Sequence, residues 1–190
     1  MTDTKAIFED RHTHSAFLER PVPDELLRRV YEIAAHGPTS ANSCPMRVVF
    51  ARTPEAKARL RPCLSEGNVE KTMKAPVTAI VAYDTRFWEL YPRLYPARDF
   101  RAVYSGNAAL AETTAFRNGT LQGAYLMIAA RALGLDCGPM SGFDNAKVDA
   151  AFFPEGRWKS NFLCNLGHGD ASKVHARNPR PSFEEACRLL

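Results

Sequence analysis

Hydrophobic and polar positions along the chain follow helical spacing in four places. Apolar residues recur at this spacing after Pro23, where two acids open a helix that Gly37 and Pro38 end. The same spacing predicts helices over 53–64 and 145–153, and Ser182 with Glu185 forms a capping-box pattern that predicts a short helix in the tail. The longest helical pattern, 108–135, is apolar nearly all round from 124 to 133. Such a helix is typical of a domain centre or a subunit interface.

Three segments instead have the pattern of strands. They are 46–52, 76–84 and 159–170, and the second is nearly all apolar, as expected of a central strand. We expect the segment 136–144 to be a glycine-rich turn, and the aromatic, basic and proline-broken segment 85–107 to be a lid over a site. Together these patterns predict one α+β domain over residues 1–190, with more helix than strand.

Composition narrows the class of protein. A chain of 190 residues with 45% hydrophobic residues has the size of one domain with a sizeable core. The N-terminus is acidic and polar where a signal peptide would be basic and then apolar, and no apolar run is long enough to span a membrane. Five scattered cysteines without a C-x-x-C pair argue against a disulfide framework and a zinc site. We therefore expect a cytoplasmic protein.

The net charge of +4 comes from basic residues interleaved with acids. This mild excess of positive charge favours an anionic ligand slightly over a neutral one, and it does not indicate a protein that binds nucleic acid. The P-loop motif is missing, "GHGDAS" lacks the third glycine of a dinucleotide fingerprint, and no H-E-x-x-H occurs. His12 and His14 are two possible metal ligands without a third, so we predict no metal site.

Polar residues that bind anions and amides stand next to the ends of several predicted elements. These groups are Arg11 with Thr13, the loop 38–42, Asn68 with Lys71 at i, i+3, the turn 138–142, and Lys173, His175 and Arg177. Taken singly, each group is explained by surface charge or turn chemistry. Their joint order along the chain is the more specific signal.

That order resembles the nitroreductase family of flavin mononucleotide (FMN) oxidoreductases over essentially the whole chain. "RHT" at 11–13 resembles the family's phosphate-binding Arg-Arg-Ser, and "PTSANSCPM" resembles its P-S-S-x-N-x-Q-P-W loop. Asn68 and Lys71 resemble its Asn-x-x-Lys, which faces the pyrimidine edge of the flavin. "PMSG" resembles the Pro-x-Glu-Gly turn beside flavin N5, and Arg177 matches the late arginine of the phosphate site.

The resemblance implies a central mixed, mostly antiparallel sheet flanked by helices, with a long buried helix at a dimer interface. It also implies FMN as cofactor, NAD(P)H as co-substrate, and a homodimer in which 38–42 contacts the flavin of the partner subunit. The flavin would carry the chemistry, without a catalytic side chain. The implied FMN-binding residues are Arg11, His12, Thr13, Pro38, Thr39, Ser40, Asn42, Asn68, Lys71, Pro139, Met140, Ser141, Gly142, His175 and Arg177, with Cys44, Met46 and Arg47 as candidate substrate contacts.

Further segments, "TAFRN" and "ARALGLDCGPMSGFD" among them, look like the RutE branch of this family, which reduces malonic semialdehyde in pyrimidine catabolism. Cys44, Met46 and Ser141 depart from the general family pattern, which fits a side branch. A broad nitro or quinone reductase is the alternative enzyme, and a flavin-binding protein without turnover is the alternative from another class. A small-molecule substrate is expected, with neither nucleic acid nor membrane as partner.

Overall fold

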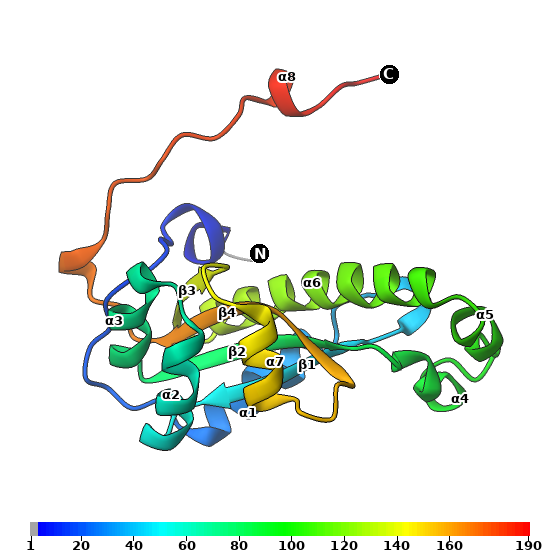
Figure 1. The fold of residues 1–190 in the computed structure, drawn as a ribbon. Coiled ribbons are helices and arrows are strands. Elements are labelled where there is room, and N and C mark those ends of the chain that lie inside the picture. The colour runs from blue at the N-terminus through cyan, green and yellow to red at the C-terminus, as the bar shows by residue number, and fades with distance from the viewer. Residues whose placement is uncertain (1–3) are drawn as a thin grey trace.

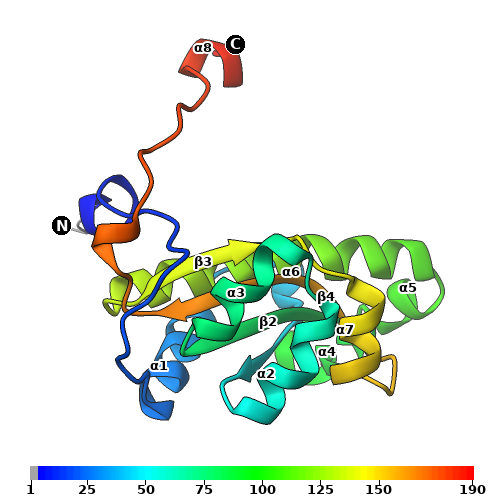
Figure 2. The same cartoon turned by 60° about the vertical axis from the view of Figure 1, so that its left-hand side comes forward.

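The computed structural model describes residues 4–190, which form an α+β fold around an antiparallel sheet. The strands are β1 (Met46–Ala51), β2 (Val77–Asp84), β3 (Asp136–Met140) and β4 (Trp158–Gly167), in the order β1-β2-β4-β3. All three pairs of these strands are antiparallel, and Thr13 adds one isolated parallel bridge to Cys137 of β3. Helices lie on both faces of the sheet (Figure 1, and turned in Figure 2).

The helices mostly begin where the sequence predicts. They are α1 (Asp24–Ala34), α2 (Pro54–Leu60), α3 (Glu66–Lys74), α4 (Tyr91–Leu94), α5 (Arg101–Ser105), α6 (Ala108–Ala132), α7 (Asn145–Phe152) and α8 (Phe183–Ala186). The predicted capping box of α8 is confirmed, because Ser182 and Glu185 bond each other's backbone N–H. Residues 61–63, expected to continue α2, instead form a 3-10 turn that starts next to Pro62.

The strand β3 was not predicted, because its Gly138 and Pro139 are typical of a turn. The sheet tolerates both residues at this position. β3 is an edge strand, so a residue without an N–H costs the sheet little there. A Cβ on Gly138 would lie 2.4 Å from the backbone oxygen of His14, so the missing side chain lets the N-terminal segment lie against β3. The expected turn is therefore limited to 141–144.

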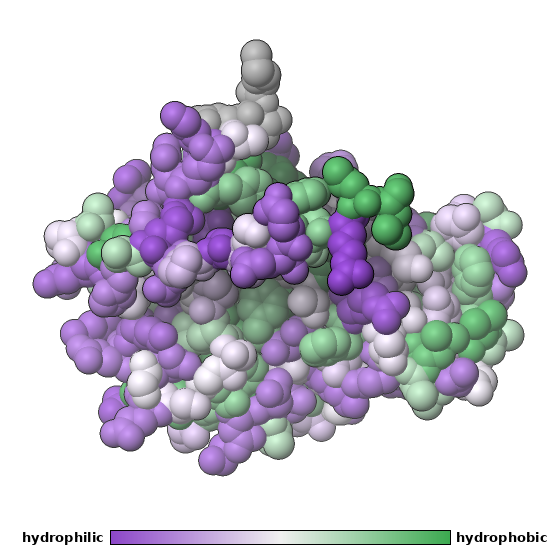
Figure 3. Space-filling model, turned by 90° about the horizontal axis from the view of Figure 1, so that it is seen from above, coloured by the Kyte–Doolittle hydropathy of each residue, from purple (hydrophilic) through white to green (hydrophobic). Residues whose placement is uncertain are grey.

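Helix α6 ends at Ala132, three residues before the predicted end, and it is not buried all round. One side packs on the sheet and on α1, while Leu110 and Leu121 are each 40% exposed and Arg117 is exposed between them. These three residues are spaced by seven and four, so they share one stripe of the helix. From above, hydrophobic residues gather at the end of the molecule that carries α5 (Figure 3).

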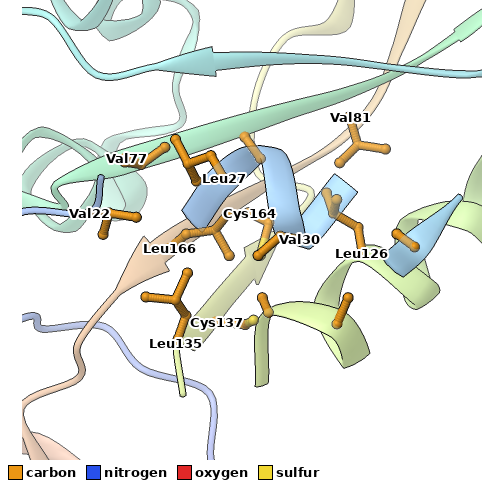
Figure 4. Packing of buried hydrophobic residues seen from close by; sticks show 14 of the residues in the cluster. Val22, Leu27, Val30, Val77, Val81, Leu126, Leu135, Cys137, Cys164 and Leu166 are labelled. Atoms are coloured by element: carbon orange, nitrogen blue, oxygen red, sulfur yellow. The ribbon is translucent and has the colours of Figure 1, made fainter. Parts of the chain in front are cut away.

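Two hydrophobic clusters fill the two faces of the sheet. On one face Val77, Ala79 and Val81 of β2 pack with α1, α6 and residues of β3 and β4, as Figure 4 shows. On the other face Ile80 and Ala82 pack with α2 and α7. The alternation follows from the two-residue period of a strand, and it confirms β2 as a central strand buried on both faces.

The segment 85–107 forms short helical turns around an aromatic cluster. Tyr91 contacts Phe100 and stacks on Tyr104, and Phe87 meets Tyr104 with ring centroids 5.0 Å apart. The cluster lies at the end of the molecule opposite to α3 (Figure 1). The carbonyl of Leu94 accepts a hydrogen bond from Asn42 Nδ2 at 2.7 Å. The segment therefore contacts the loop after α1, and its role as a lid stays a prediction.

The C-terminal tail runs away from the body of the molecule in both ribbon views (Figures 1 and 2). Residues 175–190 are all exposed, including the large apolar side chains of Phe183, Leu189 and Leu190. Among the helices of residues 4–190, none is long and apolar enough to cross a bilayer.

Candidate functional site

The two arginines predicted to bind phosphate lie side by side, although 166 positions separate them. Arg177 Nη2 donates to the backbone oxygen of Arg11 at 2.7 Å and to that of Glu9. Each nitrogen of the Arg11 guanidinium already donates to the protein: Nη1 to Asp136 at 2.9 Å, Nε to the carbonyl of Ala6 and Nη2 to that of Arg131. Within residues 4–190, Nε and Nη1 of Arg177 have no acceptor, so Arg177 is the better-placed of the two to bind an anion.

The remaining predicted phosphate contacts differ in exposure. Thr13 is exposed and pairs through its backbone with Cys137 of β3, while His12 is half-buried and His175 exposed. His14 is only 8% exposed, and its Nε2 lies 3.5 Å from Asp136 Oδ1. In the part of the chain that the structure describes, no three His, Cys, Asp or Glu side chains gather closely enough to hold a metal ion.

The predicted pyrimidine-edge and N5 motifs meet at one point. Asn68 Nδ2 of α3 donates to the carbonyl of Gly142 at 2.7 Å, and the Ser65 amide donates to the same oxygen at 3.1 Å. A Cβ on Gly142 would lie 2.4 Å from Asn68 Nδ2, so only glycine permits this approach. The helix α3 and the turn after β3 therefore form one polar corner.

This corner contains donors that the protein itself does not use. Lys71 is half-buried, and its ammonium has no hydrogen-bond acceptor and no carboxylate within 4.0 Å among residues 4–190. The amides of Ser141 and Gly142 likewise have no acceptor in this range. Beside them, Pro139 is half-buried, and Met140 is 9% exposed with its sulfur 3.4 Å from Thr72 Oγ1. One cation and two N–H groups are thus free to bind an electron-rich ring edge.

A pair of residues in the β3–β4 ladder joins this corner to the arginines. Gly138 pairs with Asn165, and the backbone of His14 lies against Gly138. On the other side, Asn165 Nδ2 donates to the carbonyl of Lys71 at 3.4 Å. The structure therefore brings Arg177, Thr13, Lys71, Asn68 and Gly142 together along the β3 edge of the sheet.

The loop 38–44 is separate from these residues, and most of its polar groups form hydrogen bonds within the loop or with neighbouring segments of the chain. Asn118 of α6 accepts from the Ser40 amide at 2.8 Å, and the hydroxyl of Thr39 accepts from the Cys44 amide at 3.2 Å. Ala41, Asn42 and Cys44 have left-handed backbone conformations, with φ of 48°, 50° and 42°. Pro38 is exposed, and its carbonyl accepts from Tyr125.

The contacts that the loop 38–44 and Arg11 make with helix α6 show how far apart they lie. Ser40 is bound at Asn118 and Arg11 at Arg131, which is 13 residues further along the helix. At 1.5 Å per residue this separation is about 20 Å. Within one chain, the loop 38–42 therefore lies far from the Arg11 end of α6.

The three candidate substrate contacts have different surroundings. Cys44 is half-buried and borders a groove of about 1200 Å³ between α1, β1 and α4. Arg47 borders this groove too, but its guanidinium donates to Asp84 at 2.7 Å and to two carbonyls. Met46 also borders this groove, but it is only 3% exposed and belongs to the core. The groove contains none of the residues of the Lys71 corner.

Sequence reasoning missed several residues that support the site. Asp136 accepts a hydrogen bond from Arg11. The buried side-chain amides of Asn118 and Gln122 accept from the backbone N–H groups of Ser40 and Met46. Lys57 is buried behind α3 and donates to Thr72 and Thr78. One signal was visible: Lys57 stands three residues before Leu60, on the apolar side of α2.

The chain is similar to several known proteins. A model of the nitroreductase family matches residues 8–168. A protein of Ralstonia nicotianae with the provisional name NADH dehydrogenase/NAD(P)H nitroreductase RSc1004 is 58% identical over 184 residues, which cover 97% of this chain and 94% of that protein.

Several solved structures have the same fold as this chain. The provisionally named nitroreductase ydfN of Bacillus subtilis has a TM-score of 0.91 at 19% identity, with both chains covered completely. A provisionally named nitroreductase of Exiguobacterium sibiricum, solved in complex with FMN, has a TM-score of 0.86 at 19% identity, covering 100% of this chain and 98% of that one. The family model and the identity to the Ralstonia protein are extensive, and this chain belongs to the nitroreductase family.

Proposed function

We propose that this protein is an FMN-dependent NAD(P)H oxidoreductase that reduces a small molecule. The observation that carries this proposal is the corner at α3, where Lys71, Asn68 and the amides of Ser141 and Gly142 gather with unused donors. Relatives named NAD(P)H nitroreductase and a similar fold solved with FMN support it.

The residues present fit FMN at its two polar ends. Arg177 keeps a free guanidinium edge for the phosphate, and the exposed Thr13 hydroxyl is a further donor. Arg11 shapes this end by holding the N-terminal segment against Asp136, a role different from the direct phosphate contact that the resemblance implies. Within residues 4–190 no carboxylate lies within 4.0 Å of the Lys71 ammonium, and Glu70 of the same helix is paired with Lys74.

When bound, FMN supplies hydride transfer between NAD(P)H and the substrate. The chain supplies position and charge. Lys71 would stabilise negative charge on the pyrimidine edge of the ring, and the Ser141 and Gly142 amides would donate to its N5–O4 side. Asn68 has one amide hydrogen committed to Gly142, which leaves its second N–H and its carbonyl oxygen for the ring.

We further propose a homodimer in which the loop 38–42 completes the site of the partner subunit. The proposal rests on the separation of about 20 Å between the loop 38–42 and the Arg11 end of α6, because at this distance one chain does not bring the loop and the Arg11 end to the same ring. The exposed stripe of α6 and the apolar side chains of the free tail are surfaces that a second copy can cover. The five free thiols support the cytoplasm as the compartment.

For the substrate we propose malonic semialdehyde, reduced to 3-hydroxypropionate, on the RutE-like segments of the sequence. Its carboxylate needs a cation, and Arg47 is less suited than expected because Asp84 already holds it. Of the other candidate arginines, Arg98 lies over the ring of Phe100 and Arg101 is paired with Asp99 on the surface. Arg117, exposed on α6 without a partner among residues 4–190, is the better candidate.

The test begins with the purified protein and FMN. We expect a yellow holoprotein that NAD(P)H bleaches and that malonic semialdehyde reoxidises faster than a nitroaromatic or a quinone does. Faster reoxidation by the nitroaromatic would favour the broad reductase, and bleaching without reoxidation by any of the three would favour a flavin-binding protein. Arg177→Ala should release most of the FMN, whereas Arg180→Ala, whose bonds go to neighbouring carbonyls of the tail, should retain it. A protein that never takes up FMN would overturn the proposal.

A further inference from the structure

A buried lysine stands directly behind the corner just described. Lys57 of α2 is 7% exposed, and its ammonium donates to Thr78 Oγ1 of β2 at 2.6 Å and to the backbone oxygen of Thr72 in α3 at 2.8 Å. Among residues 4–190, no carboxylate lies within 4.0 Å of it. Burying an unpaired charge is costly, so its presence here calls for a specific role.

The partners of Lys57 are buried as completely as the lysine. Thr72, Thr78 and Asn165 are all 0% exposed, and Thr78 Oγ1 donates to Asn165 Oδ1 at 2.7 Å. Asn165 in turn donates through Nδ2 to the carbonyl of Lys71 at 3.4 Å. One continuous polar chain therefore connects α2, two strands and α3 inside an otherwise apolar layer.

This chain ends on the last turn of α3. The final four carbonyls of a helix have no partner within it, and in α3 the carbonyl of Thr72 is one of them. Lys57 binds the carbonyl of Thr72, so this carbonyl is satisfied from the protein interior. The carbonyl of Lys71 accepts from the Ala75 amide at 3.1 Å and, as a second bond, from Asn165. A cation at the C-terminal end of a helix is also favoured by the helix dipole.

The same turn determines where the predicted cofactor residues lie. Lys71 is part of it, Asn68 stands one turn earlier and reaches Gly142, and Thr72 Oγ1 lies 3.4 Å from the sulfur of Met140. If α3 shifted or frayed at its C-terminal end, the distance between the Lys71 ammonium and the turn 141–142 would change first.

We propose that Lys57 is a positioning residue, which caps α3 from the interior and thereby holds Lys71 and Asn68 in place for the cofactor. The proposal rests on the proposed function for its consequence on FMN, but the capping itself can be measured without FMN. Lys57 does not touch the cofactor in this proposal and acts only through α3.

The first measurement uses the FMN-free protein. Lys57→Met removes the charge and its hydrogen bonds at similar length, and we expect amide hydrogen exchange over residues 66–75 to become about tenfold faster, since a buried charged hydrogen bond is lost. Exchange in α6 and α7 should stay unchanged. Equal acceleration in all three helices, or no acceleration in 66–75, would overturn the proposal.

The second measurement separates positioning from general stability. Lys57→Met should raise the Kd for FMN about tenfold in the natural background, and by a clearly smaller factor in a Lys71→Met background, because part of its effect passes through Lys71. The same factor in both backgrounds would contradict the inference. If FMN binds neither background while the exchange result holds, the proposed function fails and the capping role stands.

Thr78 provides the variant to use if Lys57→Met does not fold. Thr78→Val removes the hydroxyl that accepts from Lys57 and donates to Asn165, whereas Thr78→Ser retains it. We expect faster exchange over 66–75 and weaker FMN binding for the valine variant only. Equal behaviour of the two variants would overturn the role of this hydrogen-bond chain.

Discussion

At the scale of single residues, Lys71 has the clearest electrostatic role. Its half-buried ammonium has no partner within residues 4–190 and should stabilise the reduced flavin more than the oxidised one. If the charged hydrogen bond contributes about 1.5 to 3 kcal/mol to this difference, Lys71→Ala lowers the two-electron potential by about 30 to 65 mV. Potentiometric titration of the holoprotein measures this shift. Lys74→Ala, on the exposed side of α3 beside Glu70, is the control that should leave the potential unchanged.

Gly142 offers a steric test of the same corner. Its Cβ would lie 2.4 Å from Asn68 Nδ2, so Gly142→Ala must displace the amide that binds the turn to α3. We expect FMN affinity to fall about tenfold, the cost of one disturbed hydrogen bond. Gly67→Ala is a matched control, because a Cβ there meets nothing within 4 Å and alanine favours the helix by about 0.5 to 1 kcal/mol. Equal FMN affinity in the two variants would show that the corner does not hold the ring.

At the scale of elements, the buried end of α3 makes stability depend on pH. Burial lowers the pKa of Lys57 from 10.5 to about 8. Below pH 8 both the folded and the unfolded chain hold this proton. Between pH 8 and 10.5 the folded chain has lost it and the unfolded chain has not, so the free energy of unfolding rises with pH there, by up to about 3 kcal/mol.

Urea unfolding of the natural protein and of Lys57→Met, at several pH values from 7 to 10, isolates this contribution. Other lysines and tyrosines titrate in both proteins, so the difference between the two curves belongs to Lys57. We expect the natural protein to gain stability relative to the variant above pH 8. Parallel curves would mean that the lysine keeps its ordinary pKa in the folded chain.

The helices and strands also show which parts of this fold could be predicted from the sequence. Periodicity was enough for α1, β2 and the capping box of α8, where local pattern and final structure agree. It failed at β3, because Gly138 and Pro139 are acceptable only in an edge strand with another segment lying against it. For the same reason the pairing of Arg11 with Asp136 and of Lys57 with Thr78 could not be predicted. Each joins residues that are brought together only by the tertiary fold.

At the scale of the whole molecule, the order of motifs along the chain was more informative than their individual chemistry. Asn68 and Gly142 are 74 positions apart and meet at 2.7 Å, and Arg177 reaches the backbone of Arg11. The loop 38–42 does not join them within one chain. The proposed homodimer, with a site shared between two subunits, accounts for this separation and predicts that FMN binding depends on assembly.

Helix α6 provides the test of that dependence. Leu110, Arg117 and Leu121 form its exposed stripe, so Leu121→Glu places a charge where a second copy would pack. We expect the natural protein to sediment at about twice 21.1 kDa and the variant to shift toward the monomer, with FMN affinity falling in parallel as protein is diluted. Ala58→Glu, exposed on α2, is the control and should remain dimeric and yellow. A monomeric Leu121→Glu protein that still binds FMN tightly would place the whole site within one chain, and the loop 38–42 would then have no part in it.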